Sequence, residues 1–306
     1  MGRTEPRIAV IICSLGRPEL IRSLIPHLMA QTLPANEIIL SVPSADDVPS
    51  DIDWSAQPVP TRVLQTPKGL CIQRNHALDV ALPENDIIVF FDDDFFPSRY
   101  ALEGIANAFE AFPEIAGLTG RLLADGIQSS GISPAEAARM VAEWDETQSG
   151  AVTEPKTFMA DGVGLYGCNM AMRSSRIGDK RFDERLPLYG WQEDVDFASR
   201  LEGRKIKCDA LVGVHCGVKV GRERNGGPLG YSQVANPYYL IRKGSMPLSF
   251  GLRLGVRNIL SNHARAFRPE PWVDRRGRVK GNWLALIDIL RGRSAPERIL
   301  QLSRKR

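Results

Sequence analysis

The sequence has no long apolar run and no low-complexity tract. Its 306 residues are 43% hydrophobic and 25% charged, a balance typical of globular proteins that excludes the disordered and collagen-like classes. No apolar run, residues 87–91 included, is longer than six residues, which is far too short to span a bilayer. Residues 1–12 lack the apolar stretch and cleavage site of a signal peptide. We therefore expect a cytoplasmic protein with a sizeable core.

Cysteine is scarce and unpaired. The five cysteines are an odd number, and none belongs to a CxxC motif. Disulfide frameworks in small secreted domains use even numbers, and zinc sites use closely spaced pairs. All but Cys216 lie in or beside apolar segments, so the pattern predicts reduced, mostly buried thiols.

Acidic residues are scarce only at the C-terminal end. Residues 241–306 contain 16 Lys and Arg against 4 Asp and Glu, a net charge of +12, whereas residues 1–240 have a net charge of −9. A nucleic-acid-binding protein would spread positive charge along its fold, so we expect no nucleic-acid partner. The charge division predicts a body over residues 1–240 and a basic, helical, amphipathic extension over residues 241–306.

Short β-rich segments alternate with amphipathic segments at helical spacing in the body. This order predicts an α/β fold, an open and mostly parallel twisted sheet flanked by crossover helices. The strands are expected at residues 7–13, 37–42, 62–65, 86–91, 115–121 and 162–173, with a last one ending at His215. The helices are expected from Pro18 to Leu28 and at residues 71–81, 100–111, 134–144 and 193–202.

Three consecutive aspartates, Asp92, Asp93 and Asp94, follow the apolar strand expected at residues 86–91. The carboxyl ends of strands are where open α/β sheets bind ligands. Crowded carboxylates repel one another, so they favour a hard divalent cation such as Mg²⁺ or Mn²⁺, together with an anionic ligand. The alternative is a solvated acidic loop that caps the helix beginning near Ser98.

Several motifs occur around these aspartates in a fixed order: VIICSLGRP, KGLCIQRN, IIVFFDDD, GWQEDVD, and VH followed by YLIRK. With them, most of residues 7–243 resembles the GT-A glycosyltransferases, and more narrowly the inverting enzymes of family 2. The resemblance implies a GT-A fold with a donor half over about residues 1–125 and an acceptor half over about residues 126–240. It also implies transfer of a sugar from a nucleoside-diphosphate sugar, with inversion and with Mn²⁺ or Mg²⁺ as cofactor.

The resemblance assigns Asp92, Asp94 and His215 to the metal, with Asp94 as the likeliest direct ligand and with a pyrophosphate contact as the other role that it implies for His215. Asp92 would reach the ribose or, through water, the metal. A single histidine at a strand end is also common as a structural residue, and this alternative stays open for His215.

The same resemblance places further residues at the nucleotide. Ser14 and Arg17 lie in the first loop, and Arg74 lies in the G-x-x-x-x-R-N segment; Asp92 and Asp93 complete this donor set. The second strand ends in LSVP, without the aspartate that the family often has there, and Asp46 or Asp47 would replace it from the next loop.

Glu193 and Asp194 begin a helix expected after Trp191. By the resemblance this is the acceptor side, with Asp194 as the general base and Glu193 beside it, because an ionised carboxylate can take the proton of an attacking hydroxyl. Trp191 and Asn169 are expected to contact the acceptor sugar. The alternatives are carboxylates that complement the helix dipole and a Trp191 that is buried beside the helix start.

Basic and apolar residues interleave in the extension, as in segments that lie in a membrane interface. The extension would bring the enzyme to a saccharide acceptor on a polyprenyl lipid, at an anionic surface on the inner face of the plasma membrane, as in bacterial polysaccharide assembly. The alternative is that these helices pack on the body or form a dimer interface.

Other function classes fit the sequence less well than sugar transfer. A DxD phosphatase carries its motif near the N-terminus, but here about ninety residues precede it. A nucleotidyltransferase needs a glycine-rich loop after its first strand, and residues 13–18 contain none. A sugar-nucleotide-binding protein without transfer activity is the non-enzymatic alternative, and the intact carboxylates of both motifs argue against it.

Overall fold

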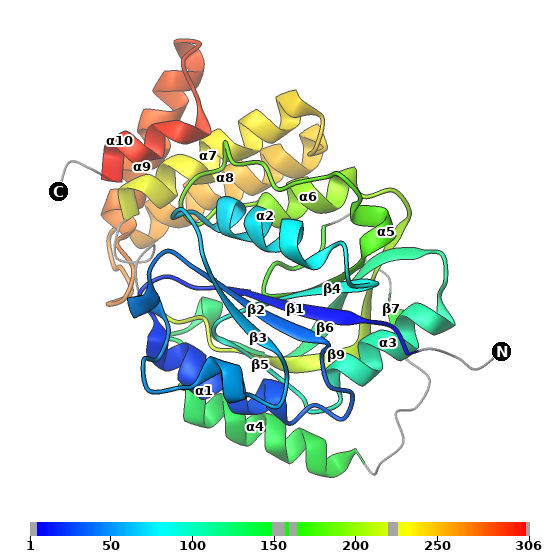
Figure 1. Cartoon of the computed structure of the whole chain (residues 1–306). Helices are drawn as coiled ribbons and strands as arrows, with labels where there is room; N and C mark the ends of the chain where they lie inside the picture. Colours follow the sequence, from blue (N-terminus) through cyan, green and yellow to red (C-terminus); the bar gives the residue numbers. More distant parts are fainter. Residues whose placement is uncertain (1–4, 149–156, 159–163, 220–225, 304–306) are drawn as a thin grey trace. The chain divides into compact units, whose positions relative to one another are not determined.

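The computed structural model describes residues 5–148, 157–158, 164–219 and 226–303 (Figure 1). These residues form two compact units, each made of several chain segments. The sheet unit comprises residues 1–68, 72–181 and 201–218, and the helical unit comprises residues 69–71, 182–200 and 219–306. The domain boundary expected after Leu240 falls inside a helix, Gly226–Lys243, and it stays a prediction.

The sheet unit is built on one sheet with the strand order β3-β2-β1-β4-β8-β6-β9-β5, and β7 pairs with β9. Strands β3, β2, β1 and β4 are parallel, β8 is antiparallel to β4 and β6, and β6 and β9 are parallel. The predicted α/β fold with a mostly parallel sheet is confirmed. The strands are β1 (Ile8–Cys13), β2 (Glu37–Val42), β3 (Thr61–Gln65), β4 (Ile87–Asp92), β5 (Phe95–Pro97), β6 (Ile115–Asp125), β7 (Thr157–Phe158), β8 (Asn169–Arg173) and β9 (Arg204–His215).

Helices cover both faces of this sheet. Figure 1 shows α1 and α4 on one side of it and α2 on the other. Helix α1 begins at Pro18, where a proline has no backbone N–H to leave unpaired, and it buries Ile21, Leu24, Ile25 and Leu28. Residues 8–12 of β1 are all fully buried, as expected of a central strand covered on both faces. The helices are α1 (Pro18–Met29), α2 (Leu70–Ala81), α3 (Ala101–Ala111), α4 (Pro134–Thr147) and α5 (Ser174–Ile177).

Some predicted boundaries were wrong. Strand β6 continues past residue 121 to Asp125, because its last residues pair with β9, and the mixed sequence RLLAD does not show this. The three-residue strand β5 was not predicted at all. The strand predicted for residues 162–173 is described as β8 from Asn169 onward, and residues 162 and 163 lie outside the described residues.

The helical unit contains α6 (Glu193–Arg200), α7 (Gly226–Lys243), α8 (Leu248–Arg265), α9 (Arg275–Leu290) and α10 (Ile299–Ser303). Helices α7 and α9 approach closely because glycines face the contact. A Cβ on Gly230 would lie 2.1 Å from the carbonyl oxygen of Arg278, and one on Gly281 would lie 2.2 Å from that of Gly227. The predicted helical extension is confirmed. No described helix has the length and apolar character needed to cross a membrane.

Candidate functional site

The three aspartates stand at the carboxyl end of β4 and in the tight turn into β5. Asp92 ends β4 and is partly exposed, whereas Asp93 and Asp94 are buried. The turn directs the chain toward β9, because Phe95 of β5 pairs with His215 at the end of β9. Two strand ends that are far apart in the sequence therefore bring acidic and imidazole groups together.

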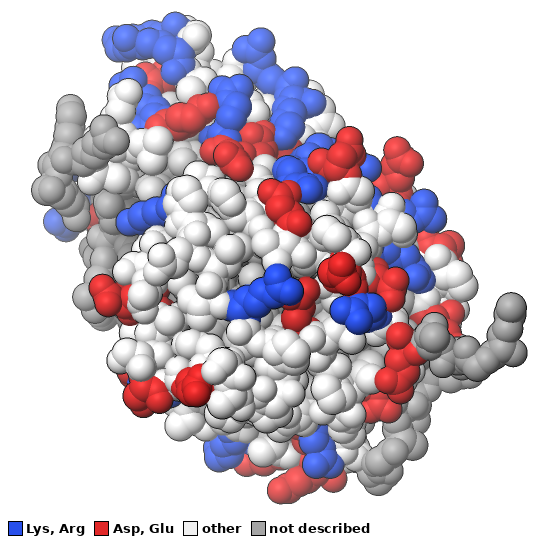
Figure 2. All heavy atoms as spheres, viewed as in Figure 1, with Lys and Arg blue, Asp and Glu red and all other residues white. Residues whose placement is uncertain are grey.

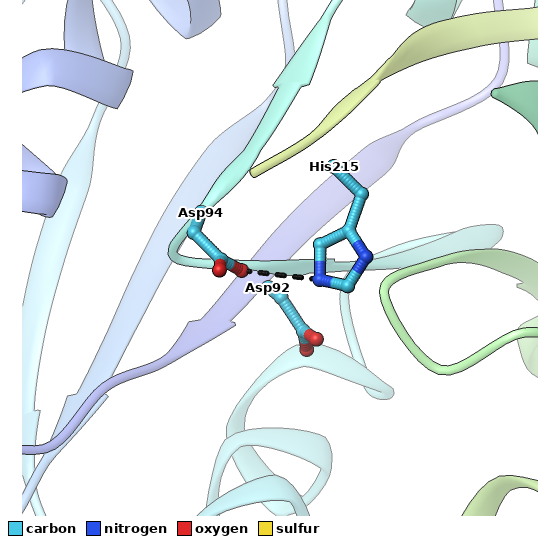
Figure 3. A group of neighbouring side chains, drawn as sticks. All are labelled: Asp92, Asp94 and His215. Carbon is cyan, nitrogen blue, oxygen red and sulfur yellow. Dashed lines mark ion pairs between the residues drawn. The ribbon is translucent and has the colours of Figure 1, made fainter. Parts of the chain in front are cut away.

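Asp92, Asp94 and His215 form one cluster, in which each residue offers a ligand atom within 4.8 Å of the others. Figure 3 shows the imidazole turned toward the Asp94 carboxylate, with His215 Nε2 3.4 Å from Asp94 Oδ1. Two carboxylates and one imidazole are a donor set that suits Mn²⁺, and such a set also occurs with other divalent ions. The structure thus brings together the three residues assigned to the metal.

Asp125, at the end of β6, holds the other side of the imidazole. His215 Nδ1 lies 2.9 Å from Asp125 Oδ1, and the Tyr166 hydroxyl donates a 3.1 Å hydrogen bond to Asp125 Oδ2. Burial favours the neutral ring, but the carboxylates of Asp125 and Asp94 overcome it and raise the pKa of His215 to about 10. Burial alone would raise the pKa of Asp94, yet its contact with His215 holds that pKa well below the usual range.

Sequence reasoning missed Asp125. The predicted strand stopped at residue 121, four residues before Asp125, and the local sequence gives no signal that the strand continues. Glycines allow the two strand ends to meet: a Cβ on Gly126 would lie 1.9 Å from the carbonyl oxygen of Cys216. Gly217 adopts a left-handed backbone conformation with a φ of +61°, and a Cβ there would lie 2.4 Å from the backbone of Gly126.

Asp93, between the two aspartates of the cluster, is fully buried. Its Oδ2 accepts a 2.5 Å hydrogen bond from the Ser14 hydroxyl and lies 3.0 Å from Arg17 Nε. Burial raises the pKa of Asp93 to about 7, against the opposing charge of Arg17. Two predicted donor residues, Ser14 and Arg17, are therefore attached to the aspartate turn through Asp93.

Arg74 extends from α2 toward Asp92. Its Nη2 lies 3.5 Å from Asp92 Oδ1 and donates a 3.0 Å hydrogen bond to the carbonyl of Gly167. Its guanidinium lies 5.2 Å from the centre of the Phe90 ring, and the side chain is almost fully buried. A buried arginine beside a partly exposed aspartate places positive charge next to the cluster.

Asp47 connects the loops that follow β1 and β2. One carboxylate oxygen accepts from the backbone N–H of Gly16, and the other accepts from Ser44 N–H at 3.0 Å. Both oxygens thus hold backbone groups. Asp46 is exposed; its N–H donates to the Ser44 hydroxyl oxygen at 3.2 Å, and its Oδ2 accepts from that hydroxyl at 3.5 Å.

Asn169, expected at the acceptor, is fully buried at the start of β8 beside Phe91. Its Oδ1 accepts a 2.7 Å hydrogen bond from the Thr119 hydroxyl. Its Nδ2 has no hydrogen-bond partner among the described residues. An unpaired buried amide is costly unless something else satisfies it.

The other acceptor candidates lie in the helical unit. Glu193 begins α6 and is buried, and Asp194 is half-buried with its Oδ1 accepting from Val195 N–H at 2.8 Å. Trp191 is half-buried, and its carbonyl accepts from Asn236 Nδ2 at 2.9 Å. The loop before α6 is tightly bent, because Gln192 adopts a φ of +73°, which costs free energy in a residue with a side chain.

Asp196 fastens α6 to the end of α7. It is fully buried, and its carboxylate lies 2.9 Å from Arg200 Nη2 and 2.8 Å from Lys243 Nζ. Lys243 also lies 2.6 Å from Asp183. The Asp196 carboxylate therefore forms ion pairs that stabilise α6, and the Asp194 carboxylate is the more accessible of the two.

Residues 9–126 match the family model described as Glycosyl transferase family 2. No curated protein matches the chain. Solved structures share its fold at low identity. S. aureus TarS 1–349 in complex with UDP-GlcNAc has a TM-score of 0.57 and 12% identity, covering 96% of this chain and 82% of that one.

A mannosyltransferase, PcManGT from Pyrobaculum calidifontis, in complex with GDP-Man and Mn²⁺, has a TM-score of 0.54 and 18% identity, covering 98% of this chain and 79% of that one. A longer S. aureus TarS structure has a TM-score of 0.51 and 14% identity over 87% of this chain, which spans only 44% of its length. The aspartate turn lies within the segment that is similar to Glycosyl transferase family 2, and the sheet has the GT-A fold.

Proposed function

We propose that this chain is a metal-dependent, inverting glycosyltransferase that moves a sugar from a nucleoside-diphosphate sugar to a hydroxyl of a saccharide acceptor. The observation that carries the proposal is the cluster of Asp92, Asp94 and His215 at the carboxyl end of buried β4. Two fold neighbours support the donor class, since one was solved with GDP-Man and Mn²⁺ and another with UDP-GlcNAc.

The residues present fit a divalent metal. Asp94 and His215 are already close to each other, and Asp92 completes a set of three donors without rearrangement of the strands. A bound divalent cation would neutralise charge on the departing diphosphate. The chain's own contribution is to hold these donors in place: β9 and Asp125 orient His215, and the turn orients both aspartates.

Positive side chains would hold the diphosphate from the sheet unit. Arg17 is about one third exposed and pairs with Asp93, and Arg74 lies beside Asp92. Guanidinium groups form charge-assisted hydrogen bonds with phosphate oxygens. Ser14, Asp46 and Asp47 complete the donor set that we propose; Asp47 would act by shaping the loop, since both its oxygens hold backbone N–H groups.

Asp194 is proposed as the general base and Glu193 as its neighbour on the acceptor side. A carboxylate that removes the proton of the acceptor hydroxyl, opposite the leaving diphosphate, gives single displacement and inversion. Trp191 and Asn169 would contact the acceptor sugar. The unpaired Nδ2 of Asn169 and the exposed part of Trp191 are the features that support these two assignments.

The acceptor that we propose is carried on a polyprenyl lipid, and the protein would work at the inner face of the plasma membrane in polysaccharide biosynthesis. The basic charge of residues 241–306 supports this part of the proposal. The catalytic part and the lipid part are separable, because sugar transfer to a water-soluble acceptor needs no membrane.

A donor screen tests the catalytic part. The melting temperature of the full chain is measured with UDP-, GDP- and dTDP-sugars, each with Mn²⁺, Mg²⁺ or EDTA. A true donor well above its Kd stabilises the fold by about 2–3 kcal/mol, and the stabilisation should require the metal. No stabilisation by any nucleotide sugar would contradict the proposal.

A further inference from the structure

Helix α8 exposes a row of apolar side chains. Leu248, Leu252, Val256 and Leu260 recur every four residues, and each is more than half exposed. Residues spaced by four lie along one side of a helix. Monomeric globular proteins rarely expose a contiguous apolar row of this kind, and such patches mark interaction surfaces.

Helix α9 adds a second exposed row beside it. Trp283, Ile287 and Leu290 are exposed, with Leu290 86% accessible. The Trp283 Nε1–H donates a 3.0 Å hydrogen bond to His263 Nε2 of α8, one turn beyond Leu260. This bond places the two rows next to each other. We call the two rows together the apolar face.

Basic side chains accompany the apolar face. Arg253 and Arg257 each follow a residue of the α8 row, and Arg276 and Lys280 precede Trp283 on the exposed side of α9. None of these four is in an ion pair with any described residue. Helix α8 contains no acidic residue, and the only one in α9, Asp288, is fully buried beside Arg298. Figure 2 shows Lys and Arg gathered at the end where Figure 1 draws α9 and α10.

We propose that the apolar face of α8 and α9 docks on a bilayer that contains anionic lipid. Apolar side chains would enter the acyl boundary while the four cations contact lipid phosphates, and Trp283 is of the residue type that sits at the headgroup level. Helix α8, with 18 residues, is about 27 Å long. It would lie in the plane of the interface, since it cannot cross.

Charge argues for a membrane over a second copy of this chain. A twofold-symmetric dimer places the same patch on both sides, so unpaired arginines would oppose arginines, with no exposed carboxylate of α8 or α9 to pair with them. An anionic bilayer instead supplies both an apolar interior and negative charge. The membrane satisfies the two features of this face at once, which a symmetric dimer does not.

The test is sedimentation of the full chain with vesicles of phosphatidylcholine and phosphatidylglycerol at low salt. Binding is expected there, with release at high salt and little binding to phosphatidylcholine alone, because salt screens the attraction to exposed charges. No nucleotide sugar is present, so the result is independent of the proposed glycosyl transfer. Failure to bind the anionic vesicles would overturn the inference without affecting the donor screen.

Two double variants separate the apolar and basic contributions. Leu252→Glu with Val256→Glu should abolish binding to the vesicles. Arg253→Gln with Arg257→Gln should lower the membrane partition coefficient by about 25-fold, which is about fivefold for each charge removed. The control, Arg139→Gln with Arg204→Gln, removes the same charge from exposed sites of the sheet unit and should bind as the parent does. Unchanged melting temperatures would show that all variants fold.

The depth of Trp283 in the bilayer and the oligomeric state of the chain give two further readouts. Brominated acyl chains should quench part of the tryptophan fluorescence, and Trp283→Phe should remove that part. If binding survives Leu252→Glu with Val256→Glu, the face is not the docking site. The inference is also wrong if the parent chain does not bind vesicles and is a dimer that Leu252→Glu with Val256→Glu dissociates. In that case the apolar face is a protein interface.

Discussion

The imidazole Nδ1 of His215 lies 2.9 Å from Asp125 Oδ1, although ninety residues separate them in the chain. The parallel pairing of β6 and β9 sets Asp125 opposite His215 in register. With Nδ1 held by this carboxylate, Nε2 is directed toward Asp94. The carboxylate thus fixes the orientation of the ring that the metal would require, as partners of ligating histidines do in metal sites.

Replacing Asp125 should therefore weaken metal binding without removing a ligand. Asp125→Asn is expected to lower Mn²⁺ affinity by about 10- to 100-fold, the usual effect of losing such a partner. Titration of the purified chain with Mn²⁺, followed by calorimetry or electron paramagnetic resonance, measures it. Unchanged affinity in a folded variant would show that His215 is not a ligand or needs no support.

Replacing Asp94 should remove a ligand charge and leave the shape nearly intact. Asp94→Asn is expected to reduce turnover of the donor by at least about 100-fold, by analogy with losing one electrostatic stabiliser from an active site. Release of nucleoside diphosphate gives the rate. Asp79→Asn is the matched control, because Asp79 is an exposed aspartate that pairs with Arg181; equal rates in the two variants would refute the role of Asp94.

Replacing Asp194 should affect catalysis, whereas replacing Asp196 should affect the stability of the fold. Asp194→Asn is expected to abolish transfer while donor binding and melting temperature stay near those of the parent, since the base contacts the acceptor. Asp196→Asn should lower the melting temperature, because it leaves Lys243 and Arg200 without their buried partner. If Asp194→Asn loses donor affinity with a near-normal kcat, the base is another residue, with Glu193 as the next candidate.

Acid should destabilise the C-terminal helices through Glu270. Hydrogen bonds from Arg275 lower the pKa of Glu270 from its usual value to about 2. A carboxylate whose pKa is depressed on folding adds stability above its unfolded pKa, and this contribution is lost as the pH falls toward the folded one. Glu270→Gln should cost about 1 kcal/mol at neutral pH, given partial solvent exposure.

Thermal melts of parent and Glu270→Gln at several pH values measure this contribution. The difference in melting temperature should narrow as the pH falls from about 4.5 toward about 2. A difference that is independent of pH would show that the ion pair with Arg275 and Arg265 contributes nothing.

The elements around the site were predictable wherever one local signal decided them. The apolar run before Asp92 predicts β4, and Pro18 predicts the start of α1, because burial on both faces and the fixed φ of proline are properties of single segments.

The rest depends on contacts between distant segments. The pairing of β6 with β9 decides where β6 ends and that Asp125 meets His215, and nothing local in RLLAD indicates it. The closeness of α7 and α9 depends on Gly230 and Gly281, which sit in different helices. Trp283 and His263 also lie in different helices. The sequence therefore showed the apolar composition of these helices but not that their exposed rows form one apolar face.

The central claim is that the aspartate turn and His215 hold a metal needed for sugar transfer, and one measurement tests it most directly. The purified chain is incubated with its nucleotide sugar and acceptor in Mn²⁺, in EDTA, and in EDTA followed by excess Mn²⁺, and the release of nucleoside diphosphate is followed. The account predicts turnover in Mn²⁺, at least about 100-fold less in EDTA, and recovery when Mn²⁺ is restored. Full turnover in EDTA would contradict it.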